Sequence, residues 1–127
     1  MDEEQLLYAA SHEWAKMDGD VCTVGITRFA VEQLTDVTYV ELPPVGRAVA
    51  KGKSFGVVES VKSANDLYAP VSGEVVEVNT KVADDPASIG ADPYDAGWMI
   101  KIKTTGTADL AGLMKKAEYD AQTAAGH

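Results

Sequence analysis

One lysine stands out among the residues of this chain that could do chemistry. Lys62 lies in the segment Glu59-Ser60-Val61-Lys62-Ser63-Ala64, between the Val-rich runs Phe55–Val61 and Val71–Val78. Residues 62–66 are small and polar, as hairpin tips are, so the pattern predicts a hairpin of the two runs with Lys62 close to its turn. A lysine amine at such a tip is exposed, and its four-carbon stem adds reach. It suits recognition by a modifying enzyme and then service as the root of a flexible arm.

No other set of residues forms a recognisable catalytic or metal-binding group. The glycines are not followed by the Lys and Ser or Thr of a phosphate loop, and His12 and His127 cannot form a paired metal site by spacing. The single cysteine, Cys22, excludes an internal disulfide and a cysteine-based zinc cluster. Its strand-like setting favours a buried thiol, with an enzyme that uses a reactive Cys22 as the alternative. The sequence therefore favours a non-catalytic protein, and plain solubility is the other interpretation of Lys62.

The charge of the chain limits its partners. Twenty Asp and Glu residues against eleven Lys and Arg give a formal net charge of −9. This argues against binding to nucleic acid or to an anionic membrane surface, and it favours a monomer that repels its own copies. No apolar run approaches the roughly 18 residues that span a bilayer. The acidic start at residues 1–4 is unlike a targeting presequence, so we expect the cytoplasm for a bacterial source and the mitochondrial matrix for a processed eukaryotic form.

The length of 127 residues suits a single domain with one core, over residues 1–127. Hydrophobic periodicity predicts that this domain is mainly β. A weak internal echo, Val45-Gly46-x-x-Val49 and Val78-Asn79-x-x-Val82, supports two similar half-units, with Gly46 and Asn79 at positive φ in equivalent turns. Two such units around the lysine hairpin predict a flattened barrel of two facing sheets with short peripheral and C-terminal helices.

Further elements are expected at definite positions. Strands are expected at Val21–Ile26, Val37–Leu42 and Trp98–Lys103, a helix capped by Thr27 through Leu34, a loop after Asp84-Asp85-Pro86, and short helices at Ala108–Met114 and Ala117–Ala121. In the last strand, Trp98, Ile100 and Ile102 should share one face. Residues 123–127 are expected to form a disordered tail.

The sequence resembles the H proteins of the glycine cleavage system from about Tyr8 to Tyr119. Several blocks carry this resemblance, in the same order and at similar intervals as in that family. They are Ser11-His12-Glu13-Trp14, Val24-Gly25-Ile26-Thr27, Val40-Glu41-Leu42-Pro43, Glu59-Ser60-Val61-Lys62, Pro70-Val71-Ser72-Gly73-Glu74-Val75, Asn79, Asp92-Pro93-Tyr94 and Gly97-Trp98.

The resemblance implies a fold, a cofactor and partners. The fold would be the barrel-sandwich of lipoyl and biotinyl carrier domains, with lipoic acid joined to Lys62 as an amide. A lipoate ligase or a lipoyl/octanoyl transferase would attach it. The arm would shuttle the aminomethyl group of glycine between glycine decarboxylase, the aminomethyltransferase and dihydrolipoyl dehydrogenase. The carrier would catalyse none of these steps; it would raise the effective concentration of the cargo at each site.

The resemblance also points to residues around the arm. Ser11, Glu13 and Asp66 match positions near the lysine, and we expect them to form the polar end of a groove that holds the cationic cargo, since a carboxylate pairs naturally with an ammonium. Alternatively, Ser11 and Glu13 only tie down the N-terminal segment. Glu59 is expected to lie beside Lys62 and to help the modifying enzyme recognise the hairpin.

Three related carriers remain as alternatives. Biotin carriers resemble a pattern with Met on both sides of the lysine, whereas Lys62 follows Val61 and precedes Ser63. Lipoyl domains of 2-oxoacid dehydrogenases usually have Asp before the lysine and lack the Ser-His-Glu-Trp block. An H-like protein that donates lipoyl groups to other enzymes would use the same lysine, so the sequence barely separates it from a glycine cleavage carrier.

Overall fold

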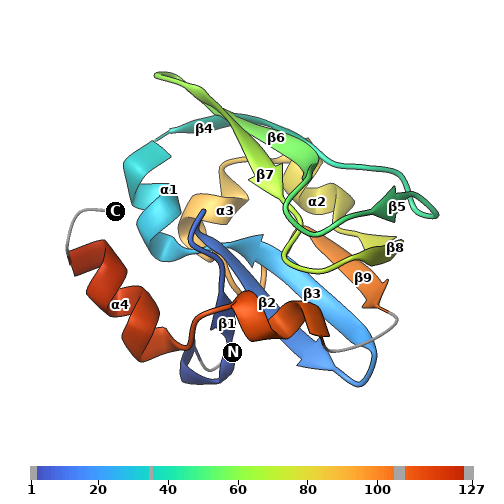
Figure 1. Cartoon of the computed structure of the whole chain (residues 1–127). Coiled ribbons are helices and arrows are strands. Elements are labelled where there is room, and N and C mark those ends of the chain that lie inside the picture. The colour runs from blue at the N-terminus through green and yellow to red at the C-terminus, as the bar shows by residue number, and fades with distance from the viewer. Residues whose placement is uncertain (1–2, 35, 105–107, 125–127) are drawn as a thin grey trace.

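Two antiparallel β-sheets face each other across the core of the computed structural model, which describes residues 3–34, 36–104 and 108–124 (Figure 1). The larger sheet has the strand order β1-β2-β3-β9-β8-β5, with bounds Leu7–Tyr8, Glu13–Asp18, Val21–Ile26, Ile100–Thr104, Gly73–Val78 and Ala48–Val49. The smaller sheet has the order β4-β6-β7, with bounds Val37–Glu41, Ser54–Ser60 and Ala64–Tyr68. The predicted mainly β fold of two facing sheets is confirmed; the two sheets do not close into a barrel.

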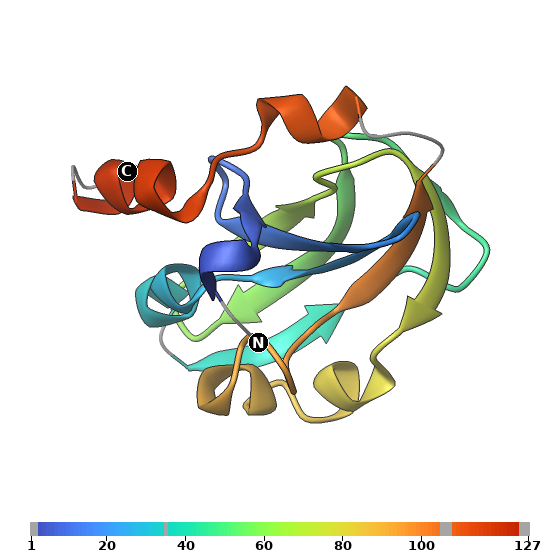
Figure 2. The same cartoon turned by 90° about the horizontal axis from the view of Figure 1, so that it is seen from below.

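Short helices cover the edges of the sheets (Figure 1, Figure 2). The α-helices are α1 (Arg28–Leu34), α2 (Thr80–Asp84), α3 (Ser88–Ala91) and α4 (Lys116–Ala124), and the 3₁₀ helices are η1 (Glu3–Gln5) and η2 (Ala108–Gly112). Thr27 caps α1 as predicted, because its Oγ1 accepts a hydrogen bond from the Ala30 N–H at 3.2 Å. Among the described helices, none is long and apolar enough to cross a membrane.

The core lies between the sheets and consists mainly of aliphatic side chains. In β9, Ile100 and Ile102 are fully buried while Lys101 and Lys103 point away from the core, which is the period-two pattern of a half-buried strand. A second buried cluster is aromatic and joins the two ends of the chain. It contains Leu6, Tyr8, Trp14, Tyr94 and Tyr119.

Trp14 of β2 occupies space that only a glycine opposite it allows. The side chain is fully buried, and its Nε1 donates a hydrogen bond to the Pro93 carbonyl oxygen at 3.1 Å. Gly25 faces Trp14 in the β2–β3 register, and a Cβ at position 25 would lie 2.6 Å from the indole ring. The pair Trp14 and Gly25 thus fixes the start of β2, where Glu13 lies.

The hairpin that bears Lys62 differs from the predicted one in its second strand. β6 pairs with β7, which covers Ala64–Tyr68, and not with Val71–Val78. Most of β7 falls in the segment that the sequence pattern predicts as the turn, because only Leu67 of the five residues of β7 is buried. β7 is an edge strand whose other side chains are exposed, so it lacks an apolar signal. The segment that was expected to pair with β6 instead provides β8 in the larger sheet.

Two predictions of local conformation near α2 and β9 are wrong. Asn79 has a φ of −84°, because it precedes α2 and its side-chain amide donates to the carbonyl oxygens of Ala96 and Trp98 at 3.0 and 2.7 Å. Of the expected pair, only Gly46 has a positive φ, at 97°. β9 begins at Ile100, and before it the alternation is broken: Met99 is buried, whereas Trp98 is half-buried and carries the Lys101 ammonium 5.0 Å from its ring centroid.

Two further expectations about the chain after α2 need correction. The segment that was expected to be a loop after Pro86 contains the short helix α3. The expected disordered tail is wrong for Thr123 and Ala124, which belong to α4. Thr123 Oγ1 donates to the Asp120 carbonyl oxygen at 3.0 Å, and the preceding side chain, Gln122, anchors the helix end. Residues 125–127 lie outside the described part of the chain.

Candidate functional site

The turn between β6 and β7 is held by the hydroxyl group of Ser60. Ser60 Oγ accepts hydrogen bonds from the N–H groups of Lys62 and Ser63 at 3.3 and 3.2 Å. The Ser60 N–H donates to the Ser63 carbonyl oxygen at 2.8 Å, and the Val61 N–H donates to the Asp36 carbonyl oxygen at 3.2 Å. These bonds fix a three-residue turn, 61–63, with Lys62 at its centre. The sequence pattern places Ser60 in the run Phe55–Val61 and does not predict this role in the turn.

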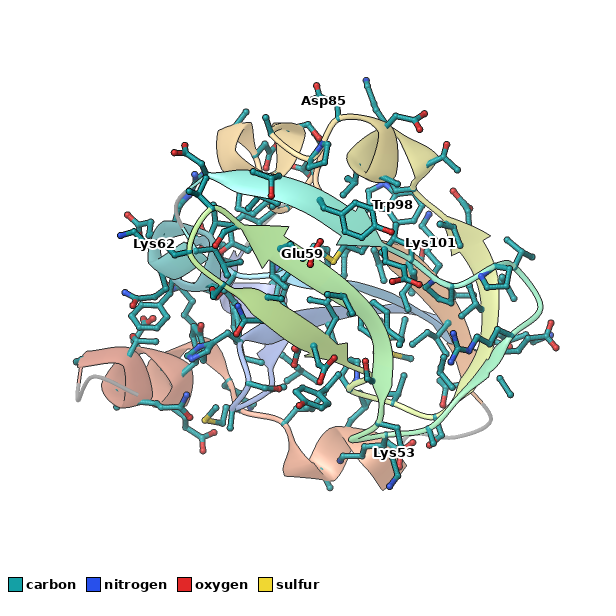
Figure 3. All side chains as sticks on the ribbon, turned by 90° about the horizontal axis from the view of Figure 1, so that it is seen from above. Lys53, Glu59, Lys62, Asp85, Trp98 and Lys101 are labelled. Carbon is teal, nitrogen blue, oxygen red and sulfur yellow. The ribbon has the colours of Figure 1, made fainter. Side chains whose placement is uncertain are left out.

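Lys62 is exposed at the end of this hairpin, which projects from the body of the protein (Figure 1, Figure 3). The preceding residue, Val61, is 72 % exposed, the highest value among the large apolar side chains that the structure describes. The following residues, Ser63 and Ala64, are small and exposed. The amine is therefore accessible from several sides, and its neighbours do not hinder the approach of another protein.

A groove of about 400 Å³ lies beside the hairpin, between the smaller sheet, α1 and the turn before β2. Its walls include apolar side chains from α1 and from both sheets, namely Ile26, Ala30, Leu34, Val58 and Leu67. Ser11, Glu13 and Asp66, the predicted polar residues, all line it. Lys62 is not among the lining residues, but the adjacent Ser63 is. The groove thus begins beside the exposed lysine and has both an apolar wall and a polar end.

Glu13 is a carboxylic acid held in a buried position at the polar end of the groove. It is 1 % exposed, accepts a hydrogen bond from Ser11 Oγ on Oε1, and accepts another from the Tyr68 N–H of β7 on Oε2 at 3.2 Å. Burial penalises the charged form and raises the Glu13 pKa to about 7, although both hydrogen bonds work in the opposite direction. At neutral pH the group therefore changes charge readily, and a nearby cation would favour its ionised form.

The wild-type protein should lose stability as the pH rises from about 4.5 to about 7, and Glu13→Gln should abolish this loss. In the unfolded chain Glu13 ionises near 4.5, whereas in the folded chain it keeps its proton up to about 7. Unfolding in that range releases a proton from Glu13. The contribution of this residue to the free energy of unfolding therefore falls by about 3 kcal/mol between these pH values and does not change further above them. The glutamine amide carries no charge; its oxygen can accept from the Tyr68 N–H while its NH2 group donates to the Ser11 hydroxyl. Urea unfolding at several pH values should therefore show the variant gaining on the wild type from pH 4.5 to 7.

Glu74→Gln, which removes an exposed carboxyl of β8, serves as the control for the loss of one negative charge. A difference in unfolding free energy between Glu13→Gln and wild type that stays constant over this pH range would contradict the assignment of a buried acid at position 13.

Glu59 lies on β6 rather than in the groove. It faces Tyr39 of β4 and Ala64 of β7 in the sheet register and is partly exposed. Figure 3 shows it further along the hairpin from Lys62. Glu59 therefore belongs to the outer surface near the hairpin, separate from the Ser11, Glu13 and Asp66 set.

Cys22 is fully buried in β3, and burial raises the pKa of its thiol to about 12. A thiol with such a pKa is almost entirely protonated at neutral pH, so it is a poor nucleophile. Within the described ranges, no cluster of three or more His, Cys, Asp or Glu side chains is arranged to hold a metal ion. Among the described residues, the hairpin and its groove are therefore the best candidate for a functional site.

Comparison with known proteins agrees with this geometry. The family model described as glycine cleavage H-protein matches residues 6–125. The glycine cleavage system H protein of Anaeromyxobacter sp. (strain K) is 53 % identical over 118 residues, covering 93 % of this chain and 92 % of that protein. The protein of the same name from Carboxydothermus hydrogenoformans is 50 % identical, covering 92 % and 90 %.

A solved structure gives the same result. The crystal structure of a glycine cleavage system H protein from Mycobacterium marinum superimposes with a TM-score of 0.88 at 44 % identity, covering 95 % of this chain and 98 % of that one. The match therefore extends over nearly the whole of both chains. On these grounds the chain belongs to the glycine cleavage H-protein family.

Proposed function

We propose that this chain is the lipoyl carrier of a glycine cleavage system, with lipoate attached through an amide bond to Nζ of Lys62. The observation that carries the proposal is the exposed lysine at the centre of a fixed turn beside a groove of about 400 Å³. Membership of the H-protein family supports the choice of pathway. In this role the chain acts as a non-catalytic subunit that serves other enzymes.

The residues around Lys62 fit a lipoyl group. The amine is exposed for acylation, and the Ser60 hydroxyl holds the turn in one conformation for a modifying enzyme. The apolar wall of the groove, including Leu34 and Val58, suits a hydrocarbon stem. When bound, lipoate would supply a dithiolane whose sulfurs carry the aminomethyl group from glycine decarboxylase to the aminomethyltransferase and are reoxidised by dihydrolipoyl dehydrogenase. The protein's own part is to present the arm and to shelter it.

Ser11, Glu13 and Asp66 would shelter the charged end of the loaded arm. Glu13 is the central residue of this set, because its carboxyl is buried and already fixed by Ser11 and Tyr68. A cationic amine placed beside it would lower the pKa of the carboxyl, which would then lose its proton to water and accept a charge-assisted hydrogen bond from the amine. Asp66, which is exposed on β7, adds a second negative group at the rim. The effect would be to hold the cargo away from bulk water.

We expect Glu13→Ala and Glu59→Ala to affect different steps. Loss of the cargo from the loaded arm by hydrolysis should be about tenfold faster in Glu13→Ala, which corresponds to one charge-assisted hydrogen bond of about 1.5 kcal/mol. Glu59 lies outside the groove on the face near Lys62, so Glu59→Ala should slow lipoylation and leave the lifetime of the cargo unchanged. Mass spectrometry measures the first rate on equally lipoylated proteins and the second during modification.

Each variant is the control for the other. An unchanged cargo lifetime in Glu13→Ala would reject a sheltering role for this residue and leave it with the task of tying down the N-terminal segment. An unchanged lipoylation rate in Glu59→Ala would reject its role in recognition by a lipoate ligase or a lipoyl/octanoyl transferase.

Reconstitution tests the proposed function as a whole. Glycine decarboxylase, the aminomethyltransferase and dihydrolipoyl dehydrogenase are mixed with the lipoylated chain, and carbon dioxide released from glycine is measured. Release that depends on the lipoylated form supports the proposal. Failure to support release, together with transfer of the lipoyl group to another lipoate-dependent enzyme, would favour the lipoate-relay alternative.

The relatives named above come from bacteria, which favours the cytoplasm over the mitochondrial matrix as the place of this activity.

A further inference from the structure

The turn that precedes β2 contains a residue in an unusual conformation. His12 has a φ of 77°, and it is the one non-glycine residue of the described chain with a positive φ. This region costs a residue with a Cβ atom about 1 kcal/mol, so neighbouring contacts must hold it. The His12 N–H donates to the Ala9 carbonyl oxygen at 2.9 Å, and the Thr27 N–H donates to the His12 carbonyl oxygen at 3.0 Å. Ser11 and Glu13, which line the groove, flank this residue directly.

Tyr119 of α4 supplies a third contact to His12 from behind the groove. Its hydroxyl lies 2.7 Å from His12 Nδ1 and 2.6 Å from Thr27 Oγ1. With Nδ1 unprotonated, the Tyr119 hydroxyl donates to the ring and accepts from Thr27. Tyr119 itself is 4 % exposed, its ring stacks on Tyr8 at a centroid distance of 4.7 Å, and it does not line the groove.

The two residues that Tyr119 joins belong to two different walls of the groove. His12 belongs to the turn that carries Ser11 and Glu13. Thr27 caps α1, and α1 contributes Ala30, Gln33 and Leu34 to the groove. A single buried hydroxyl therefore ties the polar end of the groove to its helical wall.

α4 contacts the same turn through a second side chain. Gln122 Nε2 donates to the Ala10 carbonyl oxygen at 3.0 Å. The helix lies at the edge of the molecule, against β1 and η1 (Figure 2). Since both side chains of this peripheral helix reach residues 9–12, its docking and the shape of the turn depend on each other.

We propose that Tyr119 is a positioning residue for the docking of the loaded arm: by joining His12 to Thr27, it holds Glu13 at the position where it shelters the cargo. This inference rests on the proposed carrier function. It adds to that function a residue far along the chain that does not itself line the groove. The C-terminal helix thus contributes to the protection of the cargo as well as to the stability of the fold.

Tyr119→Phe tests the proposal, with Tyr8→Phe as the matched control. Both substitutions remove one hydroxyl from the same aromatic cluster, but the Tyr8 hydroxyl donates to the Glu3 carbonyl oxygen and touches neither His12 nor Thr27. Similar losses of stability are therefore expected. On the lipoylated full chain, Tyr119→Phe should shorten the lifetime of the cargo about fivefold, because the hydroxyl group that joins His12 to Thr27 is lost. Tyr8→Phe should leave that lifetime unchanged.

A second measurement needs no lipoate. The Tyr68 amide proton bonds Glu13 Oε2, so its NMR chemical shift should follow the ionisation of Glu13 with pH. In Tyr119→Phe the midpoint should move from near 7 toward the ordinary value of a glutamate, because water reaches the carboxyl, and in Tyr8→Phe it should stay in place.

The outcomes separate the inference from the proposed function. Equal midpoints and equal cargo lifetimes in the two variants would overturn the positioning role of Tyr119. A shift of the Glu13 titration midpoint in Tyr119→Phe would support the link between Tyr119 and Glu13. If Lys62 at the same time accepts no lipoyl group, the link stands but the proposed carrier function is rejected.

Discussion

Replacing Lys62 by arginine is expected to abolish lipoylation and, with it, all carrier activity in the reconstituted system. The arginine side chain keeps the charge and the reach of lysine, so the fold and the exposed turn should persist. A guanidinium stays protonated at neutral pH and has no free electron pair to attack an activated acyl group, whereas the lysine amine has one in its neutral form. Carbon dioxide release from glycine should therefore fall to the level measured without the carrier, and the intact mass should show no adduct.

Lys53→Arg is the control, because Lys53 is also exposed but lies just before β6, at the opposite end of the hairpin from Lys62 (Figure 3). The Lys53→Arg variant should be lipoylated and active like the wild type. Full activity of Lys62→Arg, or loss of activity in Lys53→Arg, would mean that the arm is attached elsewhere.

Replacing Trp14 by alanine is expected to give the largest loss of stability, about 3 to 5 kcal/mol, as for other fully buried large aromatic residues. The indole packs against the backbone of Gly25, contacts Tyr94 at a centroid distance of 5.9 Å and donates to Pro93. Its removal leaves a cavity in the aromatic cluster and an unpaired carbonyl oxygen at Pro93. Because small domains have only about 5 to 15 kcal/mol of stability, thermal and urea unfolding should both show a marked shift.

Trp98→Ala provides the comparison within the same residue type. Trp98 is half-buried and partly covered by Lys101, so its removal should cost about 1 to 2 kcal/mol. Equal losses for the two tryptophans would contradict the conclusion that Trp14 anchors the start of β2 and Trp98 packs at the surface.

The sequence allowed good prediction of elements with a strong apolar signal. β3 and α1 have the expected positions, since Val21–Ile26 is rich in residues that favour strands and Thr27 is a good N-cap. β7 was not recognised, because an edge strand with one buried side chain looks like a polar turn. The position of Lys62 at a hairpin tip was nonetheless correct, because the turn itself is short and polar.

The groove could be predicted only in part. Ser11, Glu13 and Asp66 were named because they resemble family positions near the lysine, and they do line one groove. The link from Tyr119 to His12 joins residues 107 positions apart in the chain, and no local pattern reports such a contact. The positive φ of His12 was equally hidden, since a histidine gives no signal of the kind that a glycine in a turn provides.

The central claim is that Lys62 carries the lipoyl arm, and peptide mapping by mass spectrometry tests it most directly. The full chain is incubated with a lipoate ligase, lipoate and ATP, digested with a protease and sequenced by fragmentation. We expect a single lipoyl adduct, located on Lys62 of the turn between β6 and β7. An adduct on another lysine, or the absence of any adduct while a known H protein is modified in parallel, would contradict the claim.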